Sequence, residues 1–429
     1  MKRLPIGIQS FKKIREEDYY YVDKTNFVKL LEKGGYYFLS RPRRFGKSLL
    51  LDTLKEAFSG NRELFKGLYL YDNWDWERKH PVIKISFGKG VHRTPEDLNL
   101  KISEEFLDIQ RDEGITLEKT SLTGKFEETI KKLAEKYKEK VVVLIDEYDK
   151  PILDRIEEVE IARENREILK DFYSVLKDAD PYLKLVFITG VSRFSKVSIF
   201  SGLNQLQDIT LSPRFASICG YTQREFESVF EDLLTDVDLE EVKRWYNGYS
   251  WLGEPVYNPF DILLFLDKKT FRPYWFETGT PTFLMKLILK NRFYLPRLEA
   301  LKAGEEILSS LDVDYLALEN LLFQAGYLTI KEVRRLASRT YYVLSYPNFE
   351  VRVSFNNFYL SDLMPVVSEK EEAQIGIIEA LEEGDLERLR EILRGFFASL
   401  PLDWYRRNNL SEYEGFYASV VYALFNGSG

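Results

Sequence analysis

The triplet Gly46-Lys47-Ser48 constrains what this chain can fold into more than any other feature of its sequence. It follows a short apolar run, 36–39, and opens a segment, Ser48 to Phe58, whose apolar residues recur at helical spacing. Glycine, lysine and a hydroxyl residue between a strand and a helix are typical of a Walker A phosphate-binding loop. The first glycine of that G-x-x-x-x-G-K-[ST] pattern is replaced by Arg41.

Such a loop binds phosphates by a simple physical arrangement. Backbone N–H groups at the start of the helix face the phosphates, and the helix dipole also favours negative charge there. The lysine supplies a cation near the β- and γ-phosphates, and the hydroxyl ligates magnesium. We therefore expect ATP to lie against a continuous stretch of the loop: Arg43, Arg44, Phe45, Gly46, Lys47, Ser48 and Leu49.

A second motif begins with the uninterrupted apolar run from Val141 to Ile145, which is typical of a strand buried on both faces of a parallel sheet. Asp146 and Glu147 follow directly. Ligands of open α/β sheets bind beyond the carboxyl ends of the strands, so both motifs fall at the same edge. We expect Asp146, with Ser48, to hold Mg²⁺, and Glu147 to polarise the attacking water. An apolar strand ending in two acids is common by itself. It indicates a magnesium site here because Gly46-Lys47-Ser48 lies upstream.

A third motif follows the apolar run from Leu183 to Thr189. In P-loop ATPases with an acid after the Walker B strand, this next strand lies between the other two. Thr189 and Ser192 are then candidates to contact the γ-phosphate or the water, and Arg193 and Arg214 to neutralise charge. The predicted catalytic residues are thus Lys47, Glu147, Thr189, Ser192 and Arg193. The alternative is that Ser192 and Arg193 belong to a solvated loop.

The order of motifs indicates the fold class. Strands alternating with helices predict an α/β P-loop NTPase core of the AAA type, with a parallel sheet of about five strands, over residues 1–218. We expect a helical lid over 219–300 and a helical segment over 361–429. Between them, 301–360 suits a winged-helix-like module, a helix followed by strands at 327–330, 341–344 and 351–355.

Composition narrows the function classes. A net charge of −8 is not that of a globally basic nucleic-acid binder. One cysteine and two histidines exclude an internal disulfide and argue against a structural zinc site. No apolar run approaches the roughly 20 residues that cross a bilayer, and the sequence starts without a signal-peptide pattern. We expect a cytoplasmic protein that does not bind membranes.

Several stretches together resemble a known family, the prokaryotic AAA-ATPase-like proteins often fused to a C-terminal nuclease of the PD-(D/E)XK type. They are 4–7, 21–25, 41–48, 143–149, 189–193, 199–203, 246–249 and 257–259. The resemblance implies that arginine at the position of Arg41 is usual. Residues 413–417 resemble the entry to the family's nuclease domain, but no later Asp and Glu-x-Lys follow in this sequence. We therefore expect no nuclease activity from this chain.

Three functions remain open on the sequence. The first is an ATP-hydrolysing module that drives or gates a nuclease-type effector, in the same protein or a separate subunit. The second is a nucleotide-sensing scaffold with little turnover, against which Glu147 argues. The third is a DNA-binding regulator, although the helix at 316–323 lacks the basic residues of a groove reader. Lys331, Arg334, Arg335 and Arg339 could contact phosphates instead, without sequence specificity.

Two further expectations concern the nucleotide's surroundings. The segment from Ile6 to Phe11, with Tyr21, is expected beside the adenine base. A homo-oligomer is left open as well, because a neighbouring subunit can supply a catalytic arginine.

Overall fold

The computed structural model describes residues 2–194, 199–200, 202–277, 282–291, 293–305, 308, 317–337, 339–363, 367–400 and 414–429. The chain forms two compact units. Unit 1 comprises 1–236, 250–268 and 305–326, and unit 2 comprises 237–249, 269–304 and 327–429.

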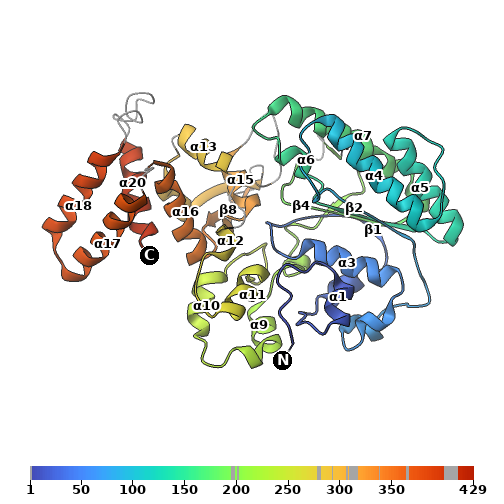
Figure 1. Cartoon of the computed structure of the whole chain (residues 1–429), viewed down its shortest axis with the longest axis horizontal. Helices are drawn as coiled ribbons and strands as arrows, with labels where there is room; N and C mark the ends of the chain where they lie inside the picture. The colour runs from blue at the N-terminus through green and yellow to red at the C-terminus, as the bar shows by residue number, and fades with distance from the viewer. Residues whose placement is uncertain are drawn as a thin grey trace. The chain divides into compact units, whose positions relative to one another are not determined.

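A parallel sheet of five strands forms the centre of unit 1 (Figure 1). Its strands are β1 (Gly35–Ser40), β2 (Val82–Ser86), β3 (Val141–Asp146), β4 (Leu183–Gly190) and β5 (Gln207–Asp208). Their order is β2-β3-β4-β1-β5, so β4 lies between β1 and β3, as the sequence predicts. Every residue of β3 is buried, which explains why its sequence is continuously apolar.

Helices cover both faces of this sheet (Figure 1). On one face lie α4 (Pro95–Glu113), α5 (Leu122–Tyr137) and α7 (Val159–Asp178), joined by a cluster of Phe106, Phe126 and Phe172. On the other lie α1 (Phe11–Glu16) and α3 (Lys47–Phe58). The remaining helical elements of unit 1 are α2 (Thr25–Leu30), η1 (Arg62–Phe65), η2 (Tyr69–Asp72), α6 (Lys150–Leu153), η3 (Asp180–Tyr182), η4 (Pro213–Phe215), α9 (Gln223–Val229), η5 (Glu231–Leu233), α11 (Pro259–Lys268) and α15 (Leu318–Ala325).

Unit 2 combines helices with a small antiparallel sheet. The sheet has the order β6-β8-β7, from β6 (Leu301–Gly304), β7 (Thr329–Leu336) and β8 (Arg339–Ser345). Its helices are α10 (Leu239–Tyr246), α12 (Tyr274–Glu277), α13 (Thr282–Lys290), η6 (Leu295–Glu299), α16 (Phe349–Leu363), α17 (Val367–Glu383), α18 (Leu386–Ser399) and α20 (Glu414–Gly427). No helix among the described residues is both long and apolar enough to cross a membrane.

One sequence expectation in this region is wrong. Residues 351–355 form part of the helix α16 rather than a third strand, and β6 supplies the third strand instead. Val351, Phe355 and Tyr359 are buried at four-residue spacing along α16, which satisfies the helical period. Leu316 and Tyr413, which begin two of the predicted segments, lie outside the described residues.

Candidate nucleotide-binding site

The loop between β1 and α3 leaves the start of a twelve-residue helix open. Gly46 precedes this helix in the left-handed conformation, with φ of +88°, and Arg44 has φ of +69°. Gly46 is exposed, and an added Cβ there would find no other heavy atom within 4 Å. A side chain at Gly46 would still strain the backbone, so glycine is needed for the turn that exposes the helix N-terminus.

Lys47 lies inside this loop. Its side chain is buried, and its Nζ donates hydrogen bonds to the carbonyls of Arg41 and Pro42, both at 2.9 Å. Burial lowers the pKa of Lys47, while the nearby carboxylates of Asp146 and Glu147 act to raise it. The acids of the second motif are therefore close enough to act on the lysine of the first. Ser48 and Leu49, on the first turn of α3, are half-buried.

Arg41, at the missing first glycine, is fully buried. Its guanidinium donates to the carbonyls of Ser40 (2.8 Å), Thr210 (3.0 Å), Phe215 (3.1 Å) and Ala216 (3.4 Å). Its central carbon lies 4.1 Å from the ring centre of Trp251. Burial lowers the pKa of Arg41 to about 10. Arg41 therefore ties the loop between β1 and α3 to the chain around 210–216, a role that sequence reasoning missed.

The next three residues of the loop, 43–45, differ in how far their side chains are exposed to solvent. Arg43 and Arg44 are exposed, and the guanidinium of Arg44 lies 4.8 Å from the ring centre of Phe260. Phe45 is buried and meets Trp251 edge-on at 5.3 Å. Arg43 and Arg44 thus both face solvent, and Arg44 lies over the ring of Phe260.

The predicted magnesium ligand and the predicted third-motif residue are in direct contact. Asp146, at the end of β3, is buried, and its carboxylate accepts a hydrogen bond of 2.7 Å from the hydroxyl of Thr189 on β4. Glu147 follows with φ of +52°, uncommon outside glycine. Its carboxylate lies beside Gly88, where an added Cβ would sit 3.1 Å from a carboxylate oxygen.

Two residues just after this acid pair hold the loop that follows β4. The Asp149 carboxylate accepts hydrogen bonds from the backbone amides of Val191 (3.1 Å) and Ser192 (2.5 Å). The Tyr148 hydroxyl donates to the Ser192 carbonyl and accepts from the Phe194 amide, both at 3.1 Å. Burial raises the pKa of Asp149 to about 6, and the Ser192 amide partly opposes this. Sequence reasoning missed this role of Tyr148 and Asp149, although their position directly after the acid pair could have indicated it.

Arg193 is engaged within unit 1. It forms an ion pair of 2.6 Å with Asp208 of β5 and donates to the carbonyl of Leu308 at 3.1 Å. Its backbone amide donates to the side chain of Gln324 on α15 at 2.9 Å. Arg214, by contrast, is exposed, with its guanidinium 5.9 Å from the ring centre of Phe215.

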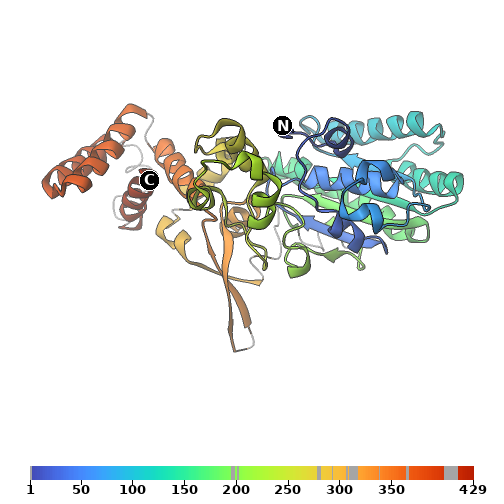
Figure 2. The same cartoon turned by 90° about the horizontal axis from the view of Figure 1, so that it is seen from below.

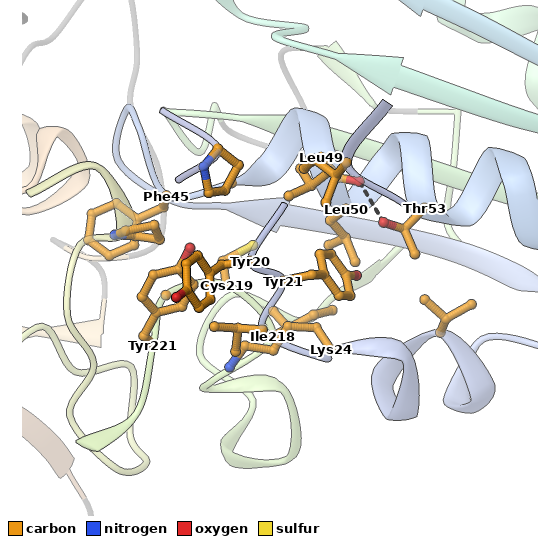
Figure 3. A pocket seen from close by; sticks show the side chains of 17 residues that line it. Tyr20, Tyr21, Lys24, Phe45, Leu49, Leu50, Thr53, Ile218, Cys219 and Tyr221 are labelled. Atoms are coloured by element: carbon orange, nitrogen blue, oxygen red, sulfur yellow. Dashed lines mark hydrogen bonds between the residues drawn. The ribbon is translucent and has the colours of Figure 1, made fainter. Parts of the chain in front are cut away.

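A cavity adjoins the loop between β1 and α3 (Figure 3). It holds about 570 Å³ of empty space, including solvent at its mouth. Leu49, Leu50 and Thr53 of α3 line one side, and Tyr20, Tyr21 and the stretch 218–221 line the other. Of the residues expected beside the base, Tyr21 is in this lining, and Phe11 packs edge-on against Tyr21 at 5.2 Å.

The sheet order, the open helix N-terminus after β1 and the acids after β3 place unit 1 among the α/β P-loop domains. A family model described as "Predicted AAA-ATPase" matches residues 5–200. A protein of Azotobacter chroococcum mcd 1, described as "Uncharacterized protein in vnfD 5'region", is 50% identical over 430 residues. The alignment covers 100% of this chain and 83% of that protein. The chain therefore belongs to the predicted AAA-ATPase family.

Proposed function

We propose that this protein binds ATP with magnesium and hydrolyses it at the edge of the sheet where β1, β3 and β4 end. The observation that carries the proposal is the position of Lys47. Its ammonium is buried inside the loop, at the open start of α3, and the carboxylates of Asp146 and Glu147 act on it. A buried cation beside an exposed helix N-terminus is suited to phosphate.

The binding step follows from these contacts. Lys47 would exchange the carbonyls of Arg41 and Pro42 for oxygens of the β- and γ-phosphates, while loop amides from Arg43 to Leu49 face the same groups. The Ser48 hydroxyl and the Asp146 carboxylate are oxygen ligands of the kind that Mg²⁺ prefers. Mg²⁺ would neutralise charge that develops on the phosphates. Thr189 fixes the orientation of Asp146 through its hydrogen bond.

The cavity beside the loop is the proposed site of the base. It begins at Phe45 and Gly46, directly next to the phosphate position, and Tyr20 and Tyr21 offer it aromatic surface. A mainly apolar cavity with few polar groups is the usual form of such a site.

For hydrolysis, we assign Glu147 as the base that takes a proton from the attacking water. Ser192 is the proposed contact to the γ-phosphate or the water, since Tyr148 and Asp149 hold its backbone. The guanidinium of Arg193 is already engaged by Asp208 and by the carbonyl of Leu308. We therefore assign Arg193 to holding the loop after β4, with an arginine from a second copy as the alternative source of charge.

The downstream role rests on the family resemblance. We propose that turnover drives or gates a nuclease-type effector, either a further domain or a separate subunit. The alternative is a nucleotide sensor with slow turnover, and Glu147 separates the two readings.

Nucleotide binding is tested by thermal unfolding of the whole chain with and without Mg-ATP. Ligand at a hundredfold excess over its dissociation constant adds about 2.7 kcal/mol of apparent stability. We expect a rise in Tm for the wild type and almost none for Lys47→Ala. The matched control is Lys55→Ala on the same helix, whose side chain is 45% exposed, and which should respond like the wild type. An equal shift in Lys47→Ala would refute the assignment of the phosphate site.

Hydrolysis is tested with Glu147→Gln. The amide keeps the shape of the side chain but cannot accept the proton, so phosphate release should fall about 100-fold or more. The ATP-dependent rise in Tm should persist, because the substitution removes little of the binding. Equal rates of phosphate release in the two proteins would favour the sensor reading.

A further inference from the structure

The outer part of the β7–β8 hairpin, residues 331–336 and 339–341, is here named the basic ribbon. Figure 2 shows β7 and β8 running side by side as a long two-stranded ribbon. All residues from Lys331 to Leu336 are exposed, so both faces of β7 meet solvent there. The third strand, β6, pairs with β8 only as far as Tyr341.

The charge of the hairpin is opposite to that of the chain. Residues 329–345 contain the basic side chains Lys331, Arg334, Arg335 and Arg339 and one acidic side chain, Glu332. The hairpin is thus positive in a chain whose net charge is −8. A basic patch on an acidic protein is the electrostatic footprint of a polyanionic partner.

The strand register distributes these cations over both faces. Arg335 lies opposite Thr340, and its neighbours Arg334 and Leu336 lie opposite Tyr341 and Arg339. Successive side chains of a strand point to opposite faces. Arg335 therefore stands on one face, and Arg334 and Arg339 stand on the other.

Existing contacts decide which cations can serve a partner best. The Nζ of Lys331 donates to the carbonyl of Pro347 at 3.0 Å. Arg334 pairs with Glu332 at 2.6 Å, but both side chains are more than half exposed, so the pair contributes little and is easily exchanged. Arg335 and Arg339 lie at the outer end of the ribbon. Their replacement should weaken the binding of a polyanion most.

The helix at 316–323, which lacks the basic residues of a groove reader, is also mostly buried over its described residues. Residues 320–324 of α15 are all buried, together with Leu318. A recognition helix needs an exposed face. The basic ribbon is therefore a better candidate for contact with nucleic acid than the described part of α15.

The shape of the ribbon favours duplex DNA. The major groove of B-form DNA admits a two-stranded β-ribbon, whereas the major groove of A-form RNA is too narrow. An isolated two-stranded hairpin is marginally stable in water, so a partner along its length would stabilise it. Its exposed apolar residues, Val333 and Leu336, are 49% and 69% exposed and could contact sugar or base-methyl groups. We propose that the basic ribbon binds duplex DNA, mainly through the phosphates and without strong sequence preference.

The test measures binding of a labelled DNA duplex to the full chain by fluorescence anisotropy over a range of salt concentrations. The variant R335Q/R339Q should bind at least about tenfold more weakly, and the slope of log K against log salt should fall by about 2. The matched control, R390Q/R394Q on α18, removes the same charge from side chains that are 60% and 72% exposed. It should bind like the wild type.

Three results would overturn the proposal. These are no salt-dependent binding by the wild type, equal losses in the ribbon and control variants, or equally tight binding of polyglutamate that the ribbon variant loses in the same way. The last would assign the ribbon to an acidic protein instead. Circular dichroism melting checks that both variants fold. The inference is separable from ATP binding, because the ribbon variant should keep its ATP-dependent rise in Tm and Lys47→Ala should keep its DNA affinity.

Discussion

Arg41 departs from the generic Walker A pattern, yet its buried side chain holds the same loop in place. A glycine in the generic pattern lets the backbone turn, whereas here a buried guanidinium binds four carbonyls and stacks on Trp251. Replacing Arg41 with the glycine of the generic pattern should therefore destabilise this protein.

We predict that Arg41→Gly lowers the free energy of unfolding by about 3–5 kcal/mol, because it strands buried acceptors and leaves a void. Arg43→Gly, at an exposed site of the same loop, should cost less than about 1 kcal/mol. Urea unfolding of both variants makes the comparison. If Arg41→Gly lowered the free energy of unfolding no more than Arg43→Gly, the buried contacts of Arg41 would not stabilise the protein.

Asp149 makes a pH dependence testable at the residue scale. Its pKa is raised to about 6 in the folded protein, against about 4 in an unfolded chain. The folded state thus binds the extra proton between these values. The stability that Asp149 contributes is present below about pH 4, is lost as pH rises to about 6, and changes little above that.

The size of this loss, for about 2 pKa units, is up to about 3 kcal/mol. Asp149→Asn removes the titration, so the stability of the wild type relative to the variant should fall across this window in urea unfolding. Asp112→Asn serves as the control, since it removes a carboxylate from a side chain that is 76% exposed. A constant difference between the wild type and Asp149→Asn at all pH values would contradict the prediction.

At the scale of elements, the close packing of the strand ends matters most. Gly190 closes β4, and an added Cβ would lie 2.6 Å from the Tyr148 ring and from an Asp149 carboxylate oxygen. The end of β4 and the turn after β3 therefore approach too closely for any side chain between them.

We predict that Gly190→Ala destabilises the protein by about 1–3 kcal/mol, because Tyr148 or the backbone must shift. It should also lower the rate of ATP hydrolysis, since the same turn holds Ser192. Gly395→Ala on α18, where a Cβ meets nothing within 4 Å, should be neutral or stabilising by up to about 1 kcal/mol. Comparable thermal melting of the two variants would show that the contact at Gly190 is not restrictive.

Long, strongly patterned elements were predictable from the sequence. The strand at Val141 to Ile145 and the helix at Ser48 to Phe58 appear where the apolar pattern placed them, because burial on both faces or one face dictates that pattern. The two-residue strand β5 carries too little pattern to detect. At 351–355, Val, Arg, Val, Ser and Phe alternate like a strand, yet five residues are too few to separate that period from the helical one.

The site was predictable in its motifs but not in its partners. Lys47, Asp146 and Thr189 come together because parallel strands end at one edge of the sheet. Trp251 against Arg41, and Asp208 against Arg193, depend on packing between segments far apart in the chain. No local pattern encodes such pairs, so only the folded structure identifies them.

At the scale of the whole molecule, nucleotide binding should act on one unit first. All residues of the proposed phosphate site and the base cavity belong to unit 1. We predict that Mg-ATP slows amide hydrogen exchange in the loop from Arg41 to Leu49 and around 190–194, with smaller changes in α17 and α18 of unit 2. Protection confined to unit 2 would place the nucleotide elsewhere.

The division of the chain also bears on how this protein can be dissected. The backbone passes between the two units at 236–237, 249–250, 268–269, 304–305 and 326–327, so neither unit is one continuous segment. A fragment cut to the stretch that the family model matches, 5–200, would lack Asp208, Trp251 and Phe260. The fragment would keep residues 41–48 while losing the aromatic and acidic side chains that contact Arg41, Arg44 and Arg193. If such a fragment were inactive, the cause would therefore be the loss of these supporting side chains and not the loss of the proposed catalytic residues.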